Sequence, residues 1–321
     1  MTPSDPRKIH VLMAGPQLPA LAEPVEREFI VHKLWLAEDR PAFLAECGPL
    51  IRGVVTNAPV GASAELIAAL PRLEIISSSG VGLDAIDLAA ARQRGVTVCS
   101  TPGVLNDCVA DTGLALLLAV ARRLCEADRF VRDGLWLKGR FPLATSLAGK
   151  TCGILGMGNI GQAVAKRAEA FGLRIAYSKP SPRSGLPFDR FDYFADPLDL
   201  ARASDFLVLT LPGGPRTHHL VNTAMLDALG PRGFLINIAR GSVVDQDALI
   251  EALVAGRIAG AGLDVFEDEP QVPPALIALD NVVLTPHIAS GTHETRAAMS
   301  QLGFANLQAH FNGQEVLTRV A

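Results

Sequence analysis

The stretch Gly156-Met157-Gly158-Asn159-Ile160-Gly161 decides the fold of this chain, because it places three glycines in the spacing GxGxxG. Directly before it lies the short apolar run Thr151–Leu155, which predicts a buried β-strand. Directly after it lies Gln162–Phe171, whose residues predict a helix. The spacing by itself is common, but between a strand and a helix it indicates a turn that binds a dinucleotide.

Each glycine of this stretch has a separate task in such a turn. Gly156 permits a tight turn, Gly158 lets the backbone approach a pyrophosphate, and Gly161 lets the helix pack closely on the strand. The helix start, around Asn159 and Ile160, offers unpaired N–H groups and the positive end of the helix dipole to the phosphates. We therefore predict that these five residues bind a dinucleotide cofactor.

Short apolar runs alternate with helical patterns along most of the chain, which is typical of a parallel α/β architecture. The runs are almost continuously apolar, which fits strands covered by helices on both faces. The first set of predicted strands is Ile9–Met13, Gly53–Thr56, Leu73–Ser77 and Val96–Cys99. The second set is Thr151–Leu155, Arg174–Tyr177, Phe206–Leu211, Phe234–Ile238, Gly260–Val265 and Val282–Leu284.

Two long helices are predicted outside these alternating units. Strong helix formers fill Asp107–Arg132, and such a helix can either join two lobes or form a dimer contact. The second helix, His293–Asn312, has polar groups suited to a helix start at Thr292 and a helix-stopping glycine at Gly313.

The overall composition narrows the classes of partner. The chain has 321 residues, of which 49% are hydrophobic and 19% charged, so it is long enough for about two globular domains. Its net charge of −4, without basic tracts, argues against binding to nucleic acid or to an anionic membrane surface. A small anionic substrate needs only a local positive site, and therefore remains compatible with this charge.

Targeting and metal-binding signals are also absent from the sequence pattern. Met1–Lys8 is polar, and the apolar run Ile9–Met13 is too short for the core of a secretory signal. The five cysteines show no CxxC pair and no histidine at ligand spacing. We therefore predict a cytoplasmic protein with reduced thiols and without a metal site.

The residues after the predicted strand Arg174–Tyr177 should lie beside the adenosine ribose, where NAD-specific sites usually carry a carboxylate. This chain has Ser178 at that position, followed by Lys179 and Arg183. A carboxylate would repel a 2′-phosphate, whereas a hydroxyl and two cations bind one through charge-assisted hydrogen bonds. The loop therefore predicts that NADP(H) is preferred and that NAD(H) is the second possible cofactor.

Polar residues also follow three predicted strands in the last third of the chain. Arg240 comes just after Phe234–Ile238, Asp264 and Glu269 belong to one short segment, and His287 follows Val282–Leu284. Ligands of open α/β sheets bind at the carboxyl ends of strands, so these side chains can converge on one site.

Three of these residues fit the chemistry of a 2-oxo acid. Arg240 can hold a carboxylate and the neighbouring carbonyl oxygen with its planar guanidinium. His287, when charged, can donate a proton to that oxygen as a hydride arrives, and in the reverse direction it accepts the hydroxyl proton. Glu269 beside the imidazole would orient it and keep it a proton donor near neutral pH. We therefore predict Arg240, Glu269 and His287 as the catalytic group.

From Val54 to His310 the chain resembles the D-isomer-specific 2-hydroxyacid dehydrogenase family. The segments that carry the resemblance are Ser79-Gly80-Val81-Gly82-Leu83-Asp84, Gly156–Gly161, Asn237–Gly241, Gly262–Glu269 and Pro286-His287. The resemblance implies two Rossmann-like, doubly wound parallel-sheet domains of the α/β class. A dinucleotide-binding domain, residues 102–286, would be inserted into a flavodoxin-like substrate domain formed by residues 1–101 and 287–321.

The resemblance also implies further site residues. Val81 and Gly82 would bind the substrate carboxylate through backbone N–H groups, Asp264 would line the nicotinamide pocket, and the enzyme would be a homodimer. Further cofactor contacts are predicted at Leu211, Thr217 and Ile238.

Within the family, Val81–Asp84, Asp128–Trp136 and Leu147–Lys150 are most similar to the branch of glyoxylate/hydroxypyruvate and hydroxyphenylpyruvate reductases. That branch commonly prefers NADPH, in agreement with the Ser178 loop. Cys108 departs from the family, which more often has a carboxylate there, and no role is derived for it.

The family includes other enzymes, and related proteins include non-enzymes. Formate dehydrogenases carry a glutamine where Glu269 stands, which argues against that activity, and phosphite dehydrogenases are similar over the cofactor domain. Phosphoglycerate dehydrogenase and a nucleotide-sensing, corepressor-like binding protein remain open alternatives.

The side chain of the substrate is predicted only in outline. Small acids such as glyoxylate and hydroxypyruvate are favoured over aryl pyruvates. We expect the pocket walls at Asn57–Gly61, Ser79 and Trp136, with a dimer interface as one way to bring them together.

Overall fold

The computed structural model describes residues 9–321, and these divide into two compact units. The central unit is Asn106–Gly291, and the terminal unit combines the residues up to Leu105 with Thr292–Ala321. Both are α/β units with parallel sheets, which confirms the predicted fold class. The unit boundaries fall a few residues beyond the predicted ones, so that His287 belongs to the central unit.

A seven-stranded parallel sheet forms the middle of the central unit, in the order β12-β11-β10-β9-β6-β7-β8. This is the doubly wound order, which reverses between β6 and β9 and creates a crevice for ligands at the carboxyl ends of the strands. The strands are β6 Thr151–Leu155, β7 Arg174–Ser178, β8 Asp192–Tyr193, β9 Phe206–Leu209, β10 Phe234–Asn237, β11 Gly260–Leu263 and β12 Val282–Leu284.

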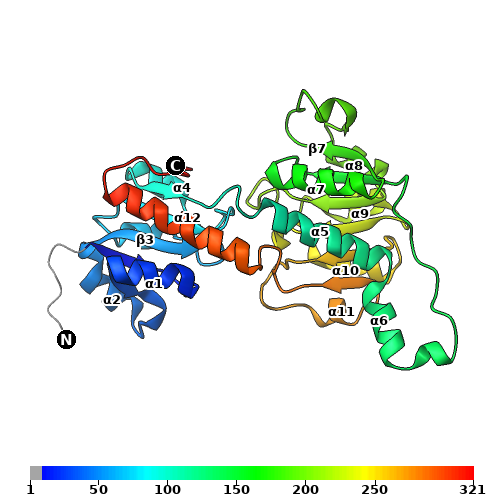
Figure 1. The fold of residues 1–321 in the computed structure, drawn as a ribbon, viewed down its shortest axis with the longest axis horizontal. Coiled ribbons are helices and arrows are strands. Elements are labelled where there is room, and N and C mark those ends of the chain that lie inside the picture. Colours follow the sequence, from blue (N-terminus) through cyan, green and yellow to red (C-terminus); the bar gives the residue numbers. More distant parts are fainter. Residues whose placement is uncertain (1–8) are drawn as a thin grey trace. The chain divides into compact units, whose positions relative to one another are not determined.

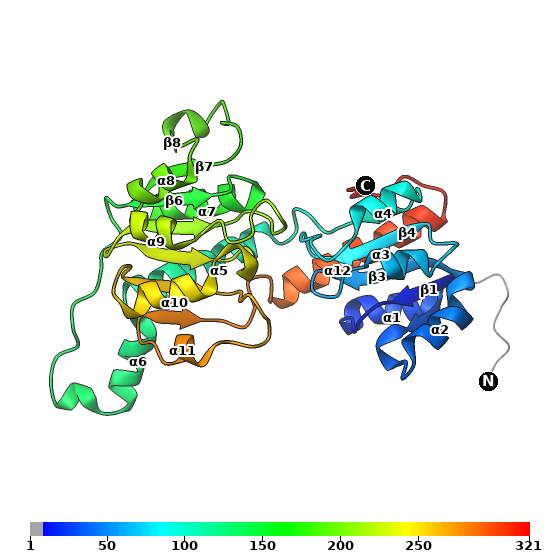
Figure 2. The ribbon, with the colours of Figure 1, turned by 180° about the vertical axis from the view of Figure 1, so that it is seen from behind.

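Helices cover both faces of this sheet. On one face α5 and α7 pack side by side (Figure 1), and on the other α8, α9 and α10 form an apolar layer (Figure 2). Each loop between a strand and the next helix therefore emerges at the carboxyl edge of the sheet. The helices are α5 Asn106–Ala121, α6 Leu124–Arg132, α7 Asn159–Ala170, α8 Pro197–Ala203, α9 Thr223–Leu229, α10 Gln246–Val254 and α11 Pro274–Ile277.

The terminal unit has a five-stranded parallel sheet in the order β2-β1-β3-β4-β5, the flavodoxin-like order. Its strands are β1 His10–Met13, β2 Ile30–Lys33, β3 Ile51–Asn57, β4 Ile75–Ser79 and β5 Thr97–Cys99. Its helices are α1 Pro19–Glu28, α2 Arg40–Cys47, α3 Ala64–Ala68, α4 Leu88–Gln93 and α12 His293–Phe311. The C-terminal helix α12 packs beside α1, so both ends of the chain build this unit (Figure 1).

The hydrophobic core of the terminal unit has two layers, because successive side chains of each strand point to opposite faces of the sheet. In β1, Leu12 belongs to the cluster beneath α2, α3 and α4, whereas Val11 and Met13 belong to the cluster beneath α1 and α12. Ile75 and Ile76 in β4 separate in the same way. Successive side chains of a strand point to opposite faces, and here both faces are buried by helices.

One predicted helix and two strands require correction. The continuous helix expected over Asp107–Arg132 is wrong, because α5 ends at Ala121 and α6 begins at Leu124. Arg123 between them has the left-handed φ of 53°, and its guanidinium holds Glu126 at 3.0 and 2.6 Å. The edge strands β2 and β8 were not predicted, since short edge strands carry polar residues and lack the apolar pattern of central ones.

No helix among residues 9–321 is both long enough and apolar enough to cross a bilayer.

Candidate active site

The glycine-rich turn lies between β6 and α7, as predicted, and its three glycines have different surroundings. Gly156 has a φ of +106°, and a Cβ there would lie 2.8 Å from the backbone nitrogen of Leu211. At Gly161 a Cβ would collide with the carbonyl oxygen of Gly156. At Gly158, by contrast, a Cβ would meet nothing within 4 Å, so open space adjoins the backbone where a pyrophosphate would approach.

The start of α7 fits a phosphate group. The helix begins at Asn159, and the N–H groups of Asn159 and Ile160 donate to no acceptor among residues 9–321. These unpaired groups and the positive end of the helix dipole favour an anion. The turn therefore fits the pyrophosphate of a dinucleotide by its geometry as well as by its sequence.

The loop after β7 brings a cation to the glycine turn. Ser178 ends β7 and is buried, and Lys179 follows it. Arg183 turns back so that its Nε donates to the carbonyl oxygen of Met157 at 2.9 Å. The hydroxyl of Tyr177 accepts the backbone N–H of Arg183 at 2.9 Å, which holds this turn in place. A cationic guanidinium therefore lies next to the GxGxxG backbone.

The remaining predicted cofactor residues lie at strand ends of the same sheet. Leu211 follows β9 and its backbone closes over Gly156. Ile238 follows β10 and contacts α5, where a Cβ at Gly113 would come within 2.8 Å of its Cδ1. The hydroxyl of Thr217 donates to the carbonyl oxygen of Pro212 at 2.8 Å, which closes the loop between β9 and α9.

Arg240 is held by a side chain that the sequence analysis did not single out. Asn237, the last residue of β10, donates from Nδ2 to the carbonyl oxygen of Arg240 at 3.0 Å and accepts the N–H of Ala239 at 3.0 Å. A Cβ at Gly241 would lie on the backbone of Phe266. The turn that carries Arg240 therefore packs directly on the segment that carries Glu269.

Glu269 and His287 form a hydrogen-bonded pair. Nδ1 of His287 lies 2.8 Å from Oε2 of Glu269, and the N–H of Phe266 donates to Oε1 of Glu269 at 3.1 Å. Both residues line a cavity of about 230 Å³, together with Phe266, Val272 and Leu284. With Nδ1 occupied, Nε2 is the ring nitrogen left for a proton transfer.

The electrostatics of this pair favour an ionised Glu269. Burial is the largest single effect and raises the pKa of the Glu269 carboxyl, whereas the hydrogen bond and the charge of His287 lower this pKa. The Phe266 N–H and the charge of Arg240 lower this pKa further, so that the net shift of the Glu269 pKa is downward. All three predicted catalytic residues therefore interact within the central unit.

Asp264 anchors the turn that carries His287. Its side chain is fully buried, and Oδ1 accepts the hydroxyl of Thr285 at 2.6 Å and the N–H of Ile288 at 2.8 Å. Oδ2 accepts the N–H of Ala289 at 2.8 Å. The predicted contact of Asp264 with nicotinamide stays a prediction. In the structure its carboxylate holds the chain on both sides of His287.

In the terminal unit, Val81 and Gly82 have N–H groups that donate to no acceptor among residues 9–321. Gly80 before them has a φ of +123°, and its N–H donates to the hydroxyl of Thr101 at 2.9 Å. The backbone N–H of Thr101 donates in turn to the carbonyl oxygen of Gly80 at 2.9 Å. This loop therefore presents two free donors, as the prediction of a carboxylate-binding backbone requires.

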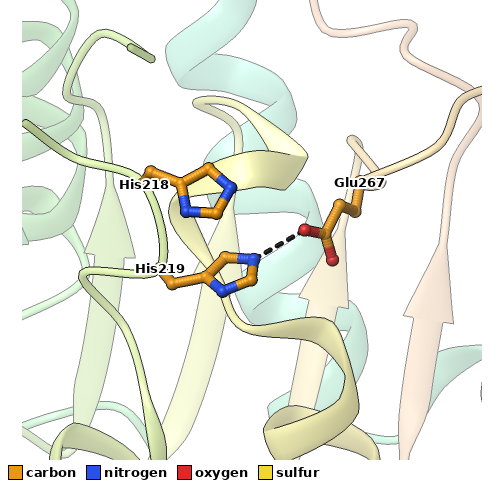
Figure 3. A group of neighbouring side chains, drawn as sticks. All are labelled: His218, His219 and Glu267. Carbon is orange, nitrogen blue, oxygen red and sulfur yellow. Dashed lines mark hydrogen bonds and ion pairs between the residues drawn. The ribbon is translucent and has the colours of Figure 1, made fainter. Parts of the chain in front are cut away.

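A group of donor atoms outside the predicted site lies before α9 and after β11. Nε2 of His219 lies 2.6 Å from Oε1 of Glu267, and the ring of His218 stacks on that of His219 with centroids 3.9 Å apart (Figure 3). Among the described residues, these three could together offer ligands to a metal ion. The group could not be predicted from the sequence, because Glu267 is distant in sequence from the two histidines.

The fold and these sites define a nicotinamide-dependent oxidoreductase, since a doubly wound domain with a GxGxxG turn carries a histidine–carboxylate pair at the same edge of its sheet. Comparison with known proteins agrees. Residues 114–289 match the family model described as the D-isomer specific 2-hydroxyacid dehydrogenase, NAD binding domain. The chain belongs to this family and is a D-2-hydroxyacid dehydrogenase.

Similar proteins extend over almost the entire chain. A hydroxyphenylpyruvate reductase of Plectranthus scutellarioides is 49% identical over 97% of this chain and 99% of its own length. A glyoxylate/hydroxypyruvate reductase A of Arabidopsis thaliana is 48% identical over 97% and 99%. The solved structure of an NADPH-dependent glyoxylate/hydroxypyruvate reductase from Sinorhizobium meliloti, in complex with NADP and malonate, superposes with a TM-score of 0.90 at 42% identity, covering 98% of this chain and 97% of that one.

Proposed function

We propose that this enzyme reduces glyoxylate to glycolate and hydroxypyruvate to D-glycerate, with NADPH as its preferred reductant and His287 as the general acid. The observation that carries the proposal is the 2.8 Å hydrogen bond between Nδ1 of His287 and ionised Glu269. That bond leaves Nε2 to deliver the proton. The similarity to a glyoxylate/hydroxypyruvate reductase over nearly the whole chain supports this substrate class.

When bound, the nicotinamide cofactor would supply the hydride. In the central unit, Arg240 is proposed to bind a carboxylate and to polarise the 2-oxo group. In the terminal unit, the N–H groups of Val81 and Gly82 are proposed to bind a carboxylate. His287 donates its proton from Nε2 to the oxygen of that 2-oxo group, while Glu269 stabilises the charged imidazole before the transfer. Asp264 fixes the turn of His287, so that the ring is already oriented when substrate binds.

The preference for NADPH rests on the loop after β7. Arg183 lies against the glycine turn through its bond to Met157, and Ser178 and Lys179 stand where an NAD-specific site would have a carboxylate. No acidic side chain occupies this position to repel a 2′-phosphate. The central unit is thus proposed to bind the cofactor.

A homodimer belongs to the same proposal. Several apolar side chains are exposed along α6, the short 3-10 helix Leu135–Leu137 and the segment after it. The exposure of so many neighbouring apolar groups to water is unfavourable and is typical of an interaction surface. The exposed side chains are Leu124, Val131, Trp136, Leu137 and Leu143, with exposed fractions from 51% to 97%. Sedimentation of the purified protein would measure its mass in solution.

The direct test measures initial rates with glyoxylate, hydroxypyruvate and 4-hydroxyphenylpyruvate, each with NADPH and with NADH. We expect glyoxylate and hydroxypyruvate to be reduced faster than the aryl acid, and NADPH to be the better reductant. A faster rate with 4-hydroxyphenylpyruvate would favour the activity named for the Plectranthus relative. Absence of turnover with all three acids would contradict the proposed function.

A further inference from the structure

A cavity of about 220 Å³ lies at the carboxyl end of the sheet in the terminal unit. Asn57 ends β3 and Ser79 ends β4, and these two residues are paired neighbours in the sheet. Arg296 and Ser300 line the same cavity from the first two turns of α12. The carboxyl end of a parallel sheet is where open α/β folds bind ligands, so the position is suited to one.

Two polar side chains of this cavity, Gln17 and Ser300, donate hydrogen bonds to backbone carbonyl oxygens, at 3.1 and 2.8 Å. Two others have no partner among the described residues: the guanidinium of Arg296 makes no ion pair or hydrogen bond with any residue from 9 to 321, and neither does the hydroxyl of Ser79. Asn57 accepts the N–H of Val60 at 3.1 Å, while its Nδ2 makes only one long contact, 3.4 Å, to the carbonyl oxygen of Pro16. One N–H of its amide therefore remains for a ligand.

No acidic residue lines the cavity, so nothing in its wall neutralises Arg296. The other lining groups are largely apolar: Pro16, Leu18, Leu21 and Met299. A half-buried, unpaired guanidinium among apolar groups favours a ligand that brings its own hydrogen-bond acceptor or negative charge. A short carbon chain that ends in a hydroxyl or a carboxylate fits this wall. Its carbon atoms can contact the apolar side chains, and its polar end can bind Arg296.

The cavity adjoins the predicted carboxylate-binding loop. Ser79 precedes Val81 by two residues, so that their Cα atoms are at most about 7 Å apart. A 2-oxo acid held by the N–H groups of Val81 and Gly82 therefore has its far end within reach of the cavity. The carboxylate of the acid would be bound after Gly80, by Val81 and Gly82, and its far end before Gly80, in the cavity beside Ser79.

We propose that this cavity binds the far end of the substrate, carbon 3 and the group it carries, and that Arg296 selects 2-oxo acids with a hydroxyl or carboxylate there. The inference rests on the proposed function and adds a specificity residue to it. Glyoxylate has no carbon 3 and so gains nothing from the cavity. Pyruvate places a methyl group there, which leaves Arg296 without a partner, whereas hydroxypyruvate places a hydroxyl there.

The test compares Arg296→Gln with the unaltered enzyme on glyoxylate, pyruvate and hydroxypyruvate, three acids that differ only at the far end. We expect kcat/KM for hydroxypyruvate to fall roughly 10- to 150-fold, as for a lost charge-assisted hydrogen bond. Values for glyoxylate and pyruvate should change little. The ratio of hydroxypyruvate to glyoxylate is the decisive quantity, since general damage to the site would lower both.

Two further variants complete the test. Arg296→Lys keeps the charge but loses the planar fork, and is expected to give an intermediate ratio. Arg27→Gln removes one positive charge from the exposed part of α1 in the same unit and should leave the ratio unaltered. Thermal unfolding of each variant, followed by circular dichroism, checks that the terminal unit remains folded.

The possible outcomes separate the two proposals. An unaltered ratio in Arg296→Gln, with glyoxylate still reduced, would overturn the role of Arg296 and leave the proposed function standing. An equal loss for all three acids would also overturn it, because Arg296 would then act on something other than the far end. If the unaltered enzyme reduces none of the acids, the proposed function is wrong and this inference falls with it.

Discussion

Nδ1 of His287 and Oε2 of Glu269 lie 2.8 Å apart in the central unit, although 18 positions separate these residues along the chain. The bond forms because Glu269 follows β11 and His287 follows β12, and these strands are neighbours in the sheet. Their loops leave the same edge side by side. The pair therefore owes its geometry to the sheet, and substitutions of its two members are coupled.

Replacing His287 by alanine should lower kcat by roughly 10²–10⁴-fold, the usual effect of losing a general acid. Binding of NADPH, measured by fluorescence titration, should stay close to normal, since the glycine turn is unaltered. His219→Ala is a matched control, because His219 also bonds a glutamate, Glu267, at 2.6 Å in the same unit. An activity near that of the unaltered enzyme in His287→Ala would refute its role.

Replacing Glu269 by glutamine should also lower kcat, because the amide orients the ring but carries no charge to stabilise a protonated imidazole. The effect should not add to that of His287→Ala, since Glu269 acts through the imidazole. The double variant is therefore expected to be about as active as His287→Ala alone. Full additivity, measured in a double-mutant cycle of kcat/KM, would mean that the two residues act independently.

Replacing Ser178 by aspartate together with Lys179 by alanine should shift the cofactor preference toward NADH. The new carboxylate can bond a ribose 2′-hydroxyl and repels a 2′-phosphate. Arg183 would keep its bond to Met157, so the glycine turn should not change. The ratio of kcat/KM for NADPH to that for NADH measures this shift. A constant ratio would show that the loop does not read the phosphate.

Replacing Glu74 by glutamine should weaken the terminal unit in a pH-dependent way. The hydrogen bonds of Arg52 to Glu74, at 2.5 and 3.0 Å, lower the pKa of the Glu74 carboxyl, with burial opposing them and His310 assisting. A depressed folded-state pKa stabilises the fold above the carboxyl's ordinary value and ceases to do so as the pH falls through the lowered one.

The difference in urea midpoint between Glu74→Gln and the unaltered protein should therefore be present at pH 7. It should shrink below about pH 4.3, the ordinary pKa of a glutamate. The pair is partly exposed to solvent, which limits the size of the effect. A midpoint difference that is the same at pH 7 and pH 3.5 would contradict the role of this ion pair.

Replacing Gly241 by alanine should destabilise the central unit, because the added Cβ would lie on the backbone of Phe266. Forcing a methyl group into a packed contact costs about 1–3 kcal/mol. The turn of Arg240 and the segment of Glu269 would move apart, so activity should fall as well. Gly139→Ala, where a Cβ meets nothing within 4 Å, is the control for denaturation midpoints. Equal midpoints for the two variants would contradict this packing argument.

Much of the fold could be predicted, because the apolar runs of central strands are visible in the sequence. Thr151–Leu155 and Val282–Leu284 were predicted with the bounds that the structure has. The break at Arg123 could not be predicted, since no glycine or proline marks it and the left-handed residue is stabilised by Glu126 three positions later. The edge strand β2 contains His32 and Lys33, whose polarity hides it.

The candidate site could be predicted where one motif carries the chemistry and not where distant residues cooperate. His287 and Glu269 follow adjacent strands, so that their pairing was accessible from the sequence. The part played by Asn237 depends on the direction of one amide, which no sequence pattern encodes. Arg296 and Ser79 line one cavity although more than two hundred positions separate them along the chain. Only the packing of α12 on β4 brings them together.

His287 has a φ of 52°, in the left-handed region that glycine adopts most easily and that histidine, like asparagine and aspartate, adopts more often than other side chains do. The backbone would relax more easily with glycine here, and the three bonds to Asp264 restrain it instead. Stability and catalysis thus make opposite demands on this one position. A search for more heat-resistant variants would be expected to discard the imidazole here, so the position should be held constant in any such search.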